Sequence, residues 1–199
     1  VYKDRTQPGA GEAGWNLFCT ANRFGFDWVN FADKKSNLLE PMAKTVMDFY
    51  TGMDKNYAPP GSGNWTWGEI GQAFSQGRLA MSVAGNASYA TLEDPAKSKV
   101  AGKVGYAPPP MLENGRDPLW VWGWGMNAGS RNKGAAWLFI EYMTSPNLIQ
   151  QIAPQYGGPA RLSVYDDPTY LAAMPSEEFV KAQQWMLTQG VNPHPELIH

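Results

Sequence analysis

Three tryptophans recur at every second position in the middle of the chain, in the run Asp117-Pro-Leu-Trp-Val-Trp-Gly-Trp-Gly-Met126. Successive side chains of an extended strand point to opposite faces, so this spacing predicts that Trp120, Trp122 and Trp124 share one face. The two glycines beside them would let a ligand or other backbone come close. A sugar or polyol suits such a face, because its C–H surface stacks on an indole while its hydroxyl groups take hydrogen bonds. We therefore predict a carbohydrate-binding segment, against the alternative that the indoles are ordinary core residues.

Polar groups that could contact a ligand occur at two further places. The loop Arg5-Thr-Gln-Pro-Gly-Ala-Gly-Glu12 enters an expected helix over 13–24, and the backbone amides at that helix start, with Arg5 nearby, could hold a polar ligand group. A solvated turn is the alternative there. The segment Ala84-Gly-Asn-Ala-Ser88 follows an expected strand over 79–83, with Asn86 or Ser88 as the N-cap of the next helix. Turns from strand to helix are where open α/β sheets place ligands.

Most of the residue patterns that an enzyme active site requires are missing from the sequence. His194 and His199 are the only histidines, and both lie in a Pro-flanked stretch, which argues against a Ser–His–Asp site. The sequence has no Gly-rich phosphate loop, no His-Glu-x-x-His motif and no Asp-rich calcium loop. The one cysteine, Cys19, excludes an internal disulfide and a cysteine-rich zinc site. We predict no catalytic residue, no metal and no cofactor.

A glycoside hydrolase is the enzyme class that tryptophan-lined subsites would fit, and it needs two carboxylates across a sugar. Thr66 followed three residues later by Glu69 matches a helix capping box, and Asp166-Asp167-Pro168 is typical of a turn, which explains these acids without catalysis. A carbohydrate-active enzyme domain and a stand-alone carbohydrate-binding module remain the alternatives to a transport receptor. The carboxylates concerned are Glu12, Glu69, Asp117, Asp166 and Asp167.

Charge and hydropathy exclude two classes of partner. Sixteen Lys and Arg against eighteen Asp and Glu leave a net charge of −2, and no basic tract exceeds two adjacent residues, so we expect no nucleic-acid partner. No run of eighteen apolar residues occurs, so we expect no membrane span.

Hydrophobic periodicity predicts alternating strands and helices with short loops, which is an α/β architecture. We expect strands over 79–83, 103–107 and 117–126. We expect helices over 13–24, 42–53, 66–77, 89–99, 130–143, from 145 onward, and 176–189. The expected buried faces are Met42, Val46, Phe49, Tyr50 and Met53 in one helix and Ala136, Phe139, Ile140 and Met143 in another.

Five segments in this order resemble the extracellular solute-binding proteins of sugar-type ABC importers, the maltose-binding-protein superfamily, and most of all its branch that binds monosaccharides and polyols. The segments are Trp67-Gly-Glu-Ile-Gly-Gln-Ala-Phe-Ser-Gln-Gly-Arg-Leu-Ala-Met81, Ser98-Lys-Val-Ala-Gly-Lys-Val-Gly-Tyr-Ala-Pro-Pro-Pro110, Trp120-Val-Trp-Gly-Trp-Gly-Met126, Ser130-Arg-Asn-Lys-Gly-Ala-Ala-Trp-Leu-Phe-Ile140 and Pro159-Ala-Arg-Leu-Ser-Val-Tyr-Asp-Asp-Pro168. Each segment alone is a weak match to the family, but the five together span most of the chain.

The resemblance implies a periplasmic-binding-protein type II-like architecture of two lobes, here incomplete, with the solute held in the cleft between them. Residues 1–123 would form the first part of the C-terminal lobe and end in the hinge strand. Residues 124–164 would belong to the N-terminal lobe, and 165–199 would return to the C-terminal lobe. The family has a long stretch before and a helical stretch after the residues matched here, so we expect an exposed apolar surface that a missing lobe would cover.

Carried over residue by residue, the resemblance assigns the site. Trp122 and Trp124 would be the sugar platforms, with Trp120 beside them. Asn86 would supply hydrogen bonds, Arg161 would reach in from the other lobe, and Arg5 and Glu12 match a loop that often carries ligand contacts. Trp65 and Trp67 would lie at the rim of the cleft.

The same resemblance implies a monomeric protein that catalyses nothing and delivers a sugar or polyol to the membrane permease of an ABC importer. It implies a periplasmic or extracellular location, with a lipid anchor on a preceding segment as one form.

Overall fold

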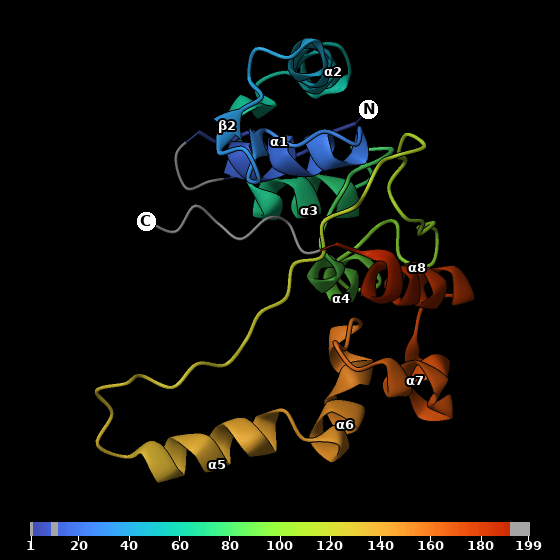
Figure 1. Cartoon of the computed structure of the whole chain (residues 1–199). Helices are drawn as coiled ribbons and strands as arrows, with labels where there is room; N and C mark the ends of the chain where they lie inside the picture. Colours follow the sequence, from blue (N-terminus) through green and yellow to red (C-terminus); the bar gives the residue numbers. More distant parts are fainter. Residues whose placement is uncertain (1, 9–11, 192–199) are drawn as a thin grey trace.

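The computed structural model describes residues 2–8 and 12–191, with the Glu12 side chain left out of the description (Figure 1). Its helices form an upper group, a middle pair and a lower group. The upper group is α1 (Glu12–Arg23), α2 (Pro41–Tyr57) and α3 (Trp67–Ser75); the middle pair is α4 (Tyr89–Leu92) and α8 (Glu177–Gln189); the lower group is α5 (Lys133–Met143), α6 (Pro146–Tyr156) and α7 (Pro168–Ala173). Short 3-10 helices are η1 (Ser62–Asn64), η2 (Asn86–Ser88) and η3 (Leu162–Asp166).

The helix positions follow from local sequence signals. The predicted capping box is present at α3, where Gly68 N–H donates to Thr66 and Thr66 N–H donates to Glu69 at 2.9 Å. Ser145 caps α6 with Pro146 in the first turn, and Ser176 caps α8, which ends before Gly190 as predicted. The helix expected over 89–99 is wrong in extent, because α4 ends at Leu92.

The predicted strands over 79–83, 103–107 and 117–126 are wrong as regular strands. The ladder in the described residues is the hairpin β1 (Val29–Asn30) with β2 (Lys35–Ser36), and two single parallel bridges join Tyr2 to Met81 and Pro118 to Val191. A strand needs a hydrogen-bonding neighbour along its length. Within the described residues, the three predicted strands find at most one such bridge each, so they run without a ladder.

Two predicted helix faces are partly wrong. On α2 Val46 is buried as expected, but Met42 and Phe49 are exposed, and Ala43 is buried instead. On α5 Phe139 is exposed. A helix buries only the residues that a neighbouring helix covers: α2 packs against α1, and α5 meets α6 near its end.

Among the described residues, the buried apolar side chains form three separate clusters rather than one core. The first lies between α1 and α2 (Ala21, Phe26, Trp28, Ala43, Val46), the second at α3 (Ile70, Ala73, Leu79), and the third in the lower part (Ala153, Val164, Tyr165, Tyr170, Val180). The third cluster packs residues from both sides of the predicted segment boundary at 164. That boundary stays a prediction.

Residues 119–132 connect the body to α5 as a long, thin loop that leaves the body and travels outward (Figure 1). We name it the crossing segment. It carries the three alternate tryptophans, so the structure places them between the upper and lower groups of helices.

Candidate ligand-binding segment

The start of the crossing segment is fixed by the residues just before it. Asp117 is buried, and its carboxylate accepts a hydrogen bond from Arg23 Nε at 2.6 Å. Leu119 N–H donates to the Val191 carbonyl at 2.8 Å, and Val191 N–H donates to the Asp117 carbonyl at 3.0 Å. Burial raises the pKa of Asp117, while the nearby Arg23 charge opposes that rise. The ion pair and the backbone bridge together tie the segment to α1 and to the chain after α8.

The three tryptophans differ in their surroundings. Trp120 is 37% exposed and its ring lies 4.0 Å, centroid to centroid, from the ring of Trp15 on α1. Trp122 is 94% exposed. Trp124 is 56% exposed and meets Phe139 of α5 edge to face at 5.3 Å. The rings are therefore not an ordinary core: Trp122 and Trp124 present most of their surface outward, while Trp120 is held against the body.

Asn86 lies where three segments meet. Its side-chain amide nitrogen donates to Gln183 Oε1 of α8 at 3.1 Å and to the Gly158 carbonyl at 3.4 Å. Both N–H groups of the Asn86 side chain thus donate to the protein. A hydrogen bond to a ligand would therefore be made by the side-chain carbonyl oxygen. No side-chain cap is made by either Asn86 or Ser88, so the predicted N-cap there is wrong.

Arg161 lies in the loop before η3 and reaches back to the end of α5. Its Nη2 donates to the Thr144 carbonyl at 3.2 Å, and its Nε is buried without a hydrogen-bond partner among the described residues. A buried N–H without a partner is costly, so this guanidinium has capacity for one more acceptor.

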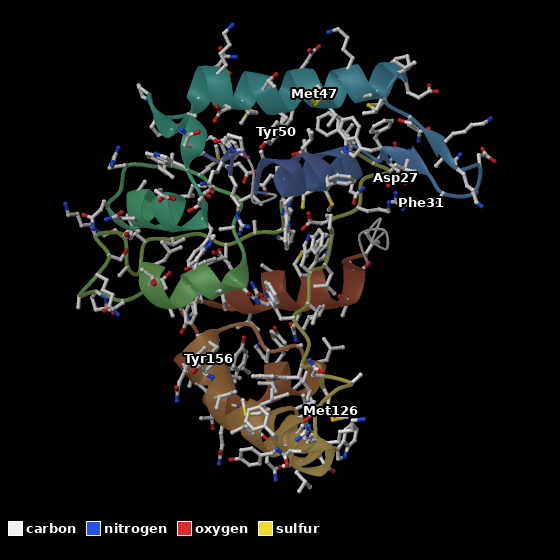
Figure 2. The ribbon with its side chains drawn as sticks, turned by 90° about the vertical axis from the view of Figure 1, so that its left-hand side faces the viewer. Asp27, Phe31, Met47, Tyr50, Met126 and Tyr156 are labelled. Atoms are coloured by element: carbon white, nitrogen blue, oxygen red, sulfur yellow. The ribbon has the colours of Figure 1, made fainter. Side chains whose placement is uncertain are left out.

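The loop at Arg5 is part of a polar network between α1 and α2. Asp4 accepts from Arg5 N–H at 2.8 Å, from Tyr2 O–H at 3.0 Å and from Asn16. Burial raises the pKa of Asp4, and the hydrogen bonds from Arg5 N–H and Tyr2 O–H oppose the rise. The Arg5 carbonyl accepts from Tyr50 O–H at 2.7 Å, and Figure 2 shows Tyr50 between α2 and α1. The contacts of the Glu12 side chain lie outside the described residues.

The contacts given by the structure for Trp65 are with residues outside the crossing segment, and Trp67 lies at the start of α3. The Arg78 guanidinium lies 5.6 Å from the ring centroid of Trp65, which also packs on the α3 cluster. Trp67 is exposed at the start of α3. Their assignment to the rim of a cleft stays a prediction.

A cavity of about 10 Å³, room for a single water molecule, lies among Tyr2, Asp4, Tyr50 and Asp54. An open hollow lies beside the β1–β2 hairpin, near Asp27 and Phe31, which Figure 2 places at the edge of the upper part. Neither hollow is lined by a candidate tryptophan. Trp122 and Trp124 instead present most of their surface to solvent.

Sequence reasoning missed Trp15 as a neighbour of the crossing segment. Trp15 and Cys19 lie four residues apart on α1, so they share one face of that helix, and the face meets Trp120. The periodicity was visible in the sequence, but the partner of the face was not.

Comparison with known protein families decides the identity. Residues 3–147 match the family model described as bacterial extracellular solute-binding protein. The chain belongs to the bacterial extracellular solute-binding protein family.

Relatives within this family agree with that assignment. The chain is 30% identical over 178 residues to a mannitol-binding protein of Pseudomonas aeruginosa, covering 83% of this chain and 40% of the relative. It is 31% identical over 125 residues to a probable amino-acid ABC transporter periplasmic-binding protein of Sinorhizobium fredii, covering 63% of this chain and 28% of the relative.

Solved structures confirm the predicted fold class. A solute-binding protein from Agrobacterium vitis with bound D-mannitol matches with a TM-score of 0.82 and 26% identity, over 98% of this chain and 48% of that one. The solute-binding protein described here therefore has part of a type II periplasmic-binding-protein fold. The chain spans less than half the length of each of these three relatives. In the described residues, no helix combines the length and the apolar character needed to cross a bilayer.

Proposed function

We propose that this solute-binding protein is the receptor of an ABC-type importer, that it binds a sugar or polyol between two lobes, and that it delivers the solute to a membrane permease. The observation that carries the proposal is the exposure of Trp122 and Trp124 on a segment that connects two groups of helices. Exposed indoles are costly in water unless a ligand or another surface covers them, and a carbohydrate ring or chain can cover them.

Polar groups from other parts of the chain complete the proposed site. The Asn86 carbonyl oxygen and the buried Arg161 Nε are an acceptor and a donor for hydroxyl groups. Trp120, Arg5, Glu12, Trp65 and Trp67 are further proposed contacts. The receptor acts as a monomer in the periplasm or at the cell surface, with or without a lipid anchor, and catalyses no reaction.

A titration tests the proposal on the protein expressed with its natural ends. D-mannitol, maltose and a panel of amino acids are added while tryptophan fluorescence and calorimetry report binding, and a product assay by chromatography runs beside them. Saturable polyol or sugar binding without product supports the receptor. Sugar turnover would identify a carbohydrate-active enzyme, and preference for an amino acid would overturn the carbohydrate assignment.

A variant assigns the binding to the crossing segment. We expect Trp122→Ala to lose about 1–3 kcal/mol of binding free energy, because a central aromatic anchor contributes that much. Trp122→Phe retains a flat ring and should recover most of the loss. Tyr156→Ala removes another exposed aromatic side chain, from α6, and should leave affinity unchanged (Figure 2). Unchanged affinity in Trp122→Ala would exclude this indole from the site.

A further inference from the structure

Trp120 is where the crossing segment leaves the body. Up to Leu119 the backbone is hydrogen-bonded to Val191 and anchored by the Asp117–Arg23 ion pair. After Trp120 the next side chain, Val121, is exposed, and the segment runs on to α5 without a bridge to any other described residue. The side chain of Trp120 is therefore the last one held by the body before the exposed indoles begin.

Two residues of α1 lie against Trp120. The Trp15 ring lies 4.0 Å from the Trp120 ring with 36° between their planes. The Cys19 thiol, one turn further along α1, is buried and lies beside the Trp120 side chain. An indole with a flat aromatic neighbour and a second buried side chain beside it is held in place from two positions on the same helix.

We propose that Trp15 is a positioning residue for solute binding: with Cys19 it clamps Trp120 and so sets the direction in which Trp122 and Trp124 are presented to the solute. The clamp rests on the proposed receptor function, because it acts on the same tryptophans. Trp15 itself need not touch the solute. Its effect comes from where it holds Trp120, two residues before the first exposed platform.

The geometry makes Cys19 a reporter of the clamp. It is the only cysteine of the sequence, it lies against Trp120, and it is buried. Burial raises the pKa of the Cys19 thiol, which lowers its reactivity as long as the cover is in place. Loss of the clamp should expose the thiol to alkylation.

Two measurements on the protein with its natural ends test the clamp. Iodoacetamide alkylation of Cys19 is followed by peptide mass spectrometry, and D-mannitol affinity, or that of the best ligand of the earlier panel, is measured by calorimetry. We expect Trp15→Ala to speed alkylation several-fold and to weaken binding about tenfold, while Trp15→Phe restores both. Phe18→Ala, which removes a half-exposed ring from the same helix, should change neither. Trp15→Leu fills the site of the ring with an apolar side chain and replaces Trp15→Ala if that variant does not fold.

The two readouts separate the outcomes. Unchanged alkylation in Trp15→Ala would overturn the clamp itself. Faster alkylation with unchanged affinity would show that Trp15 is a core residue without influence on the site. If the wild-type protein binds none of the ligands, the receptor function fails, and the alkylation rates still decide whether Trp15 and Cys19 hold Trp120.

Discussion

A close approach of two backbone segments at the end of α1 explains why residue 115 is a glycine. At Gly115 the chain passes the end of α1, where Leu112 N–H donates to the Arg23 carbonyl at 3.0 Å and Arg116 N–H donates to the Asn22 carbonyl at 2.8 Å. These bonds satisfy carbonyls that a helix end leaves without partners. They also bring the loop to the correct place for Asp117 to pair with Arg23.

We predict that Gly115→Ala destabilises the fold. A Cβ at this position would lie 2.1 Å from the Arg23 carbonyl oxygen and 2.9 Å from the Leu112 carbonyl oxygen, so backbone would have to move. We expect a loss of about 1–3 kcal/mol in the free energy of unfolding, measured by urea denaturation. Gly134→Ala is the matched control, because a Cβ there meets open space. A similar free energy of unfolding for both variants would contradict the close approach.

Single residues also mark the limit of what the sequence could predict about the site. The spacing of Trp120, Trp122 and Trp124 identified the crossing segment, because its signal lies within five residues. The stacking of Trp15 on Trp120 joins positions far apart in the chain, and no local pattern carries that information.

At the scale of elements, helices were easier to predict than strands for a physical reason. The caps of α3, α6 and α8 are made by side chains within three residues of the helix start. A cap is therefore a local interaction, and its residues can be recognised in the sequence. A strand depends on a partner elsewhere in the chain. Among the described residues, the extended segments at Met81 and Pro118 each meet a partner at a single bridge, to Tyr2 and to Val191 respectively.

The cap of α3 predicts a pH-dependent contribution to stability. Hydrogen bonds from Thr66 hold the pKa of Glu69 below its ordinary value of 4.5. A carboxylate whose folded pKa is lowered stabilises the fold above its unfolded pKa, and this contribution disappears as the pH falls through the folded pKa. We therefore expect Glu69→Gln to lower stability at neutral pH, with the difference from wild type shrinking below about pH 4.5.

Urea midpoints measured across the acid range test this expectation. Thr66→Ala should cost about 1 kcal/mol, because it removes the acceptor for Gly68 N–H and a donor to Glu69. Thr66→Ser keeps the hydroxyl and is the control. A difference between wild type and Glu69→Gln that does not vary with pH would show that the ionised carboxylate is not part of the cap.

At the scale of the molecule, the lower helices carry apolar side chains that the described part of the chain leaves exposed. Trp137, Leu138, Phe139 and Tyr142 are all exposed and lie on several sides of α5; we name them the α5 apolar band. A helix that is apolar on most of its sides is typical of a buried helix. The exposed apolar surface expected from the sequence is therefore present. The two-lobe division itself came from family resemblance, since composition and periodicity do not specify which segments share a lobe.

We predict that further residues of the full-length receptor bury the α5 apolar band, consistent with relatives of more than twice this length. In the protein with its natural ends, Leu138→Glu should then cost more than about 3 kcal/mol of unfolding free energy, because it places an unpaired charge in a core. Leu39→Glu, at a position 99% exposed before α2, should stay within about 0.5 kcal/mol of wild type. Hydrogen exchange of α5 amides gives a second measurement, with slow exchange expected in the full-length protein. Equal, small effects of both substitutions, together with fast exchange in α5, would mean that the band faces solvent in the receptor, and the partner of α5 would then have to be sought outside the chain.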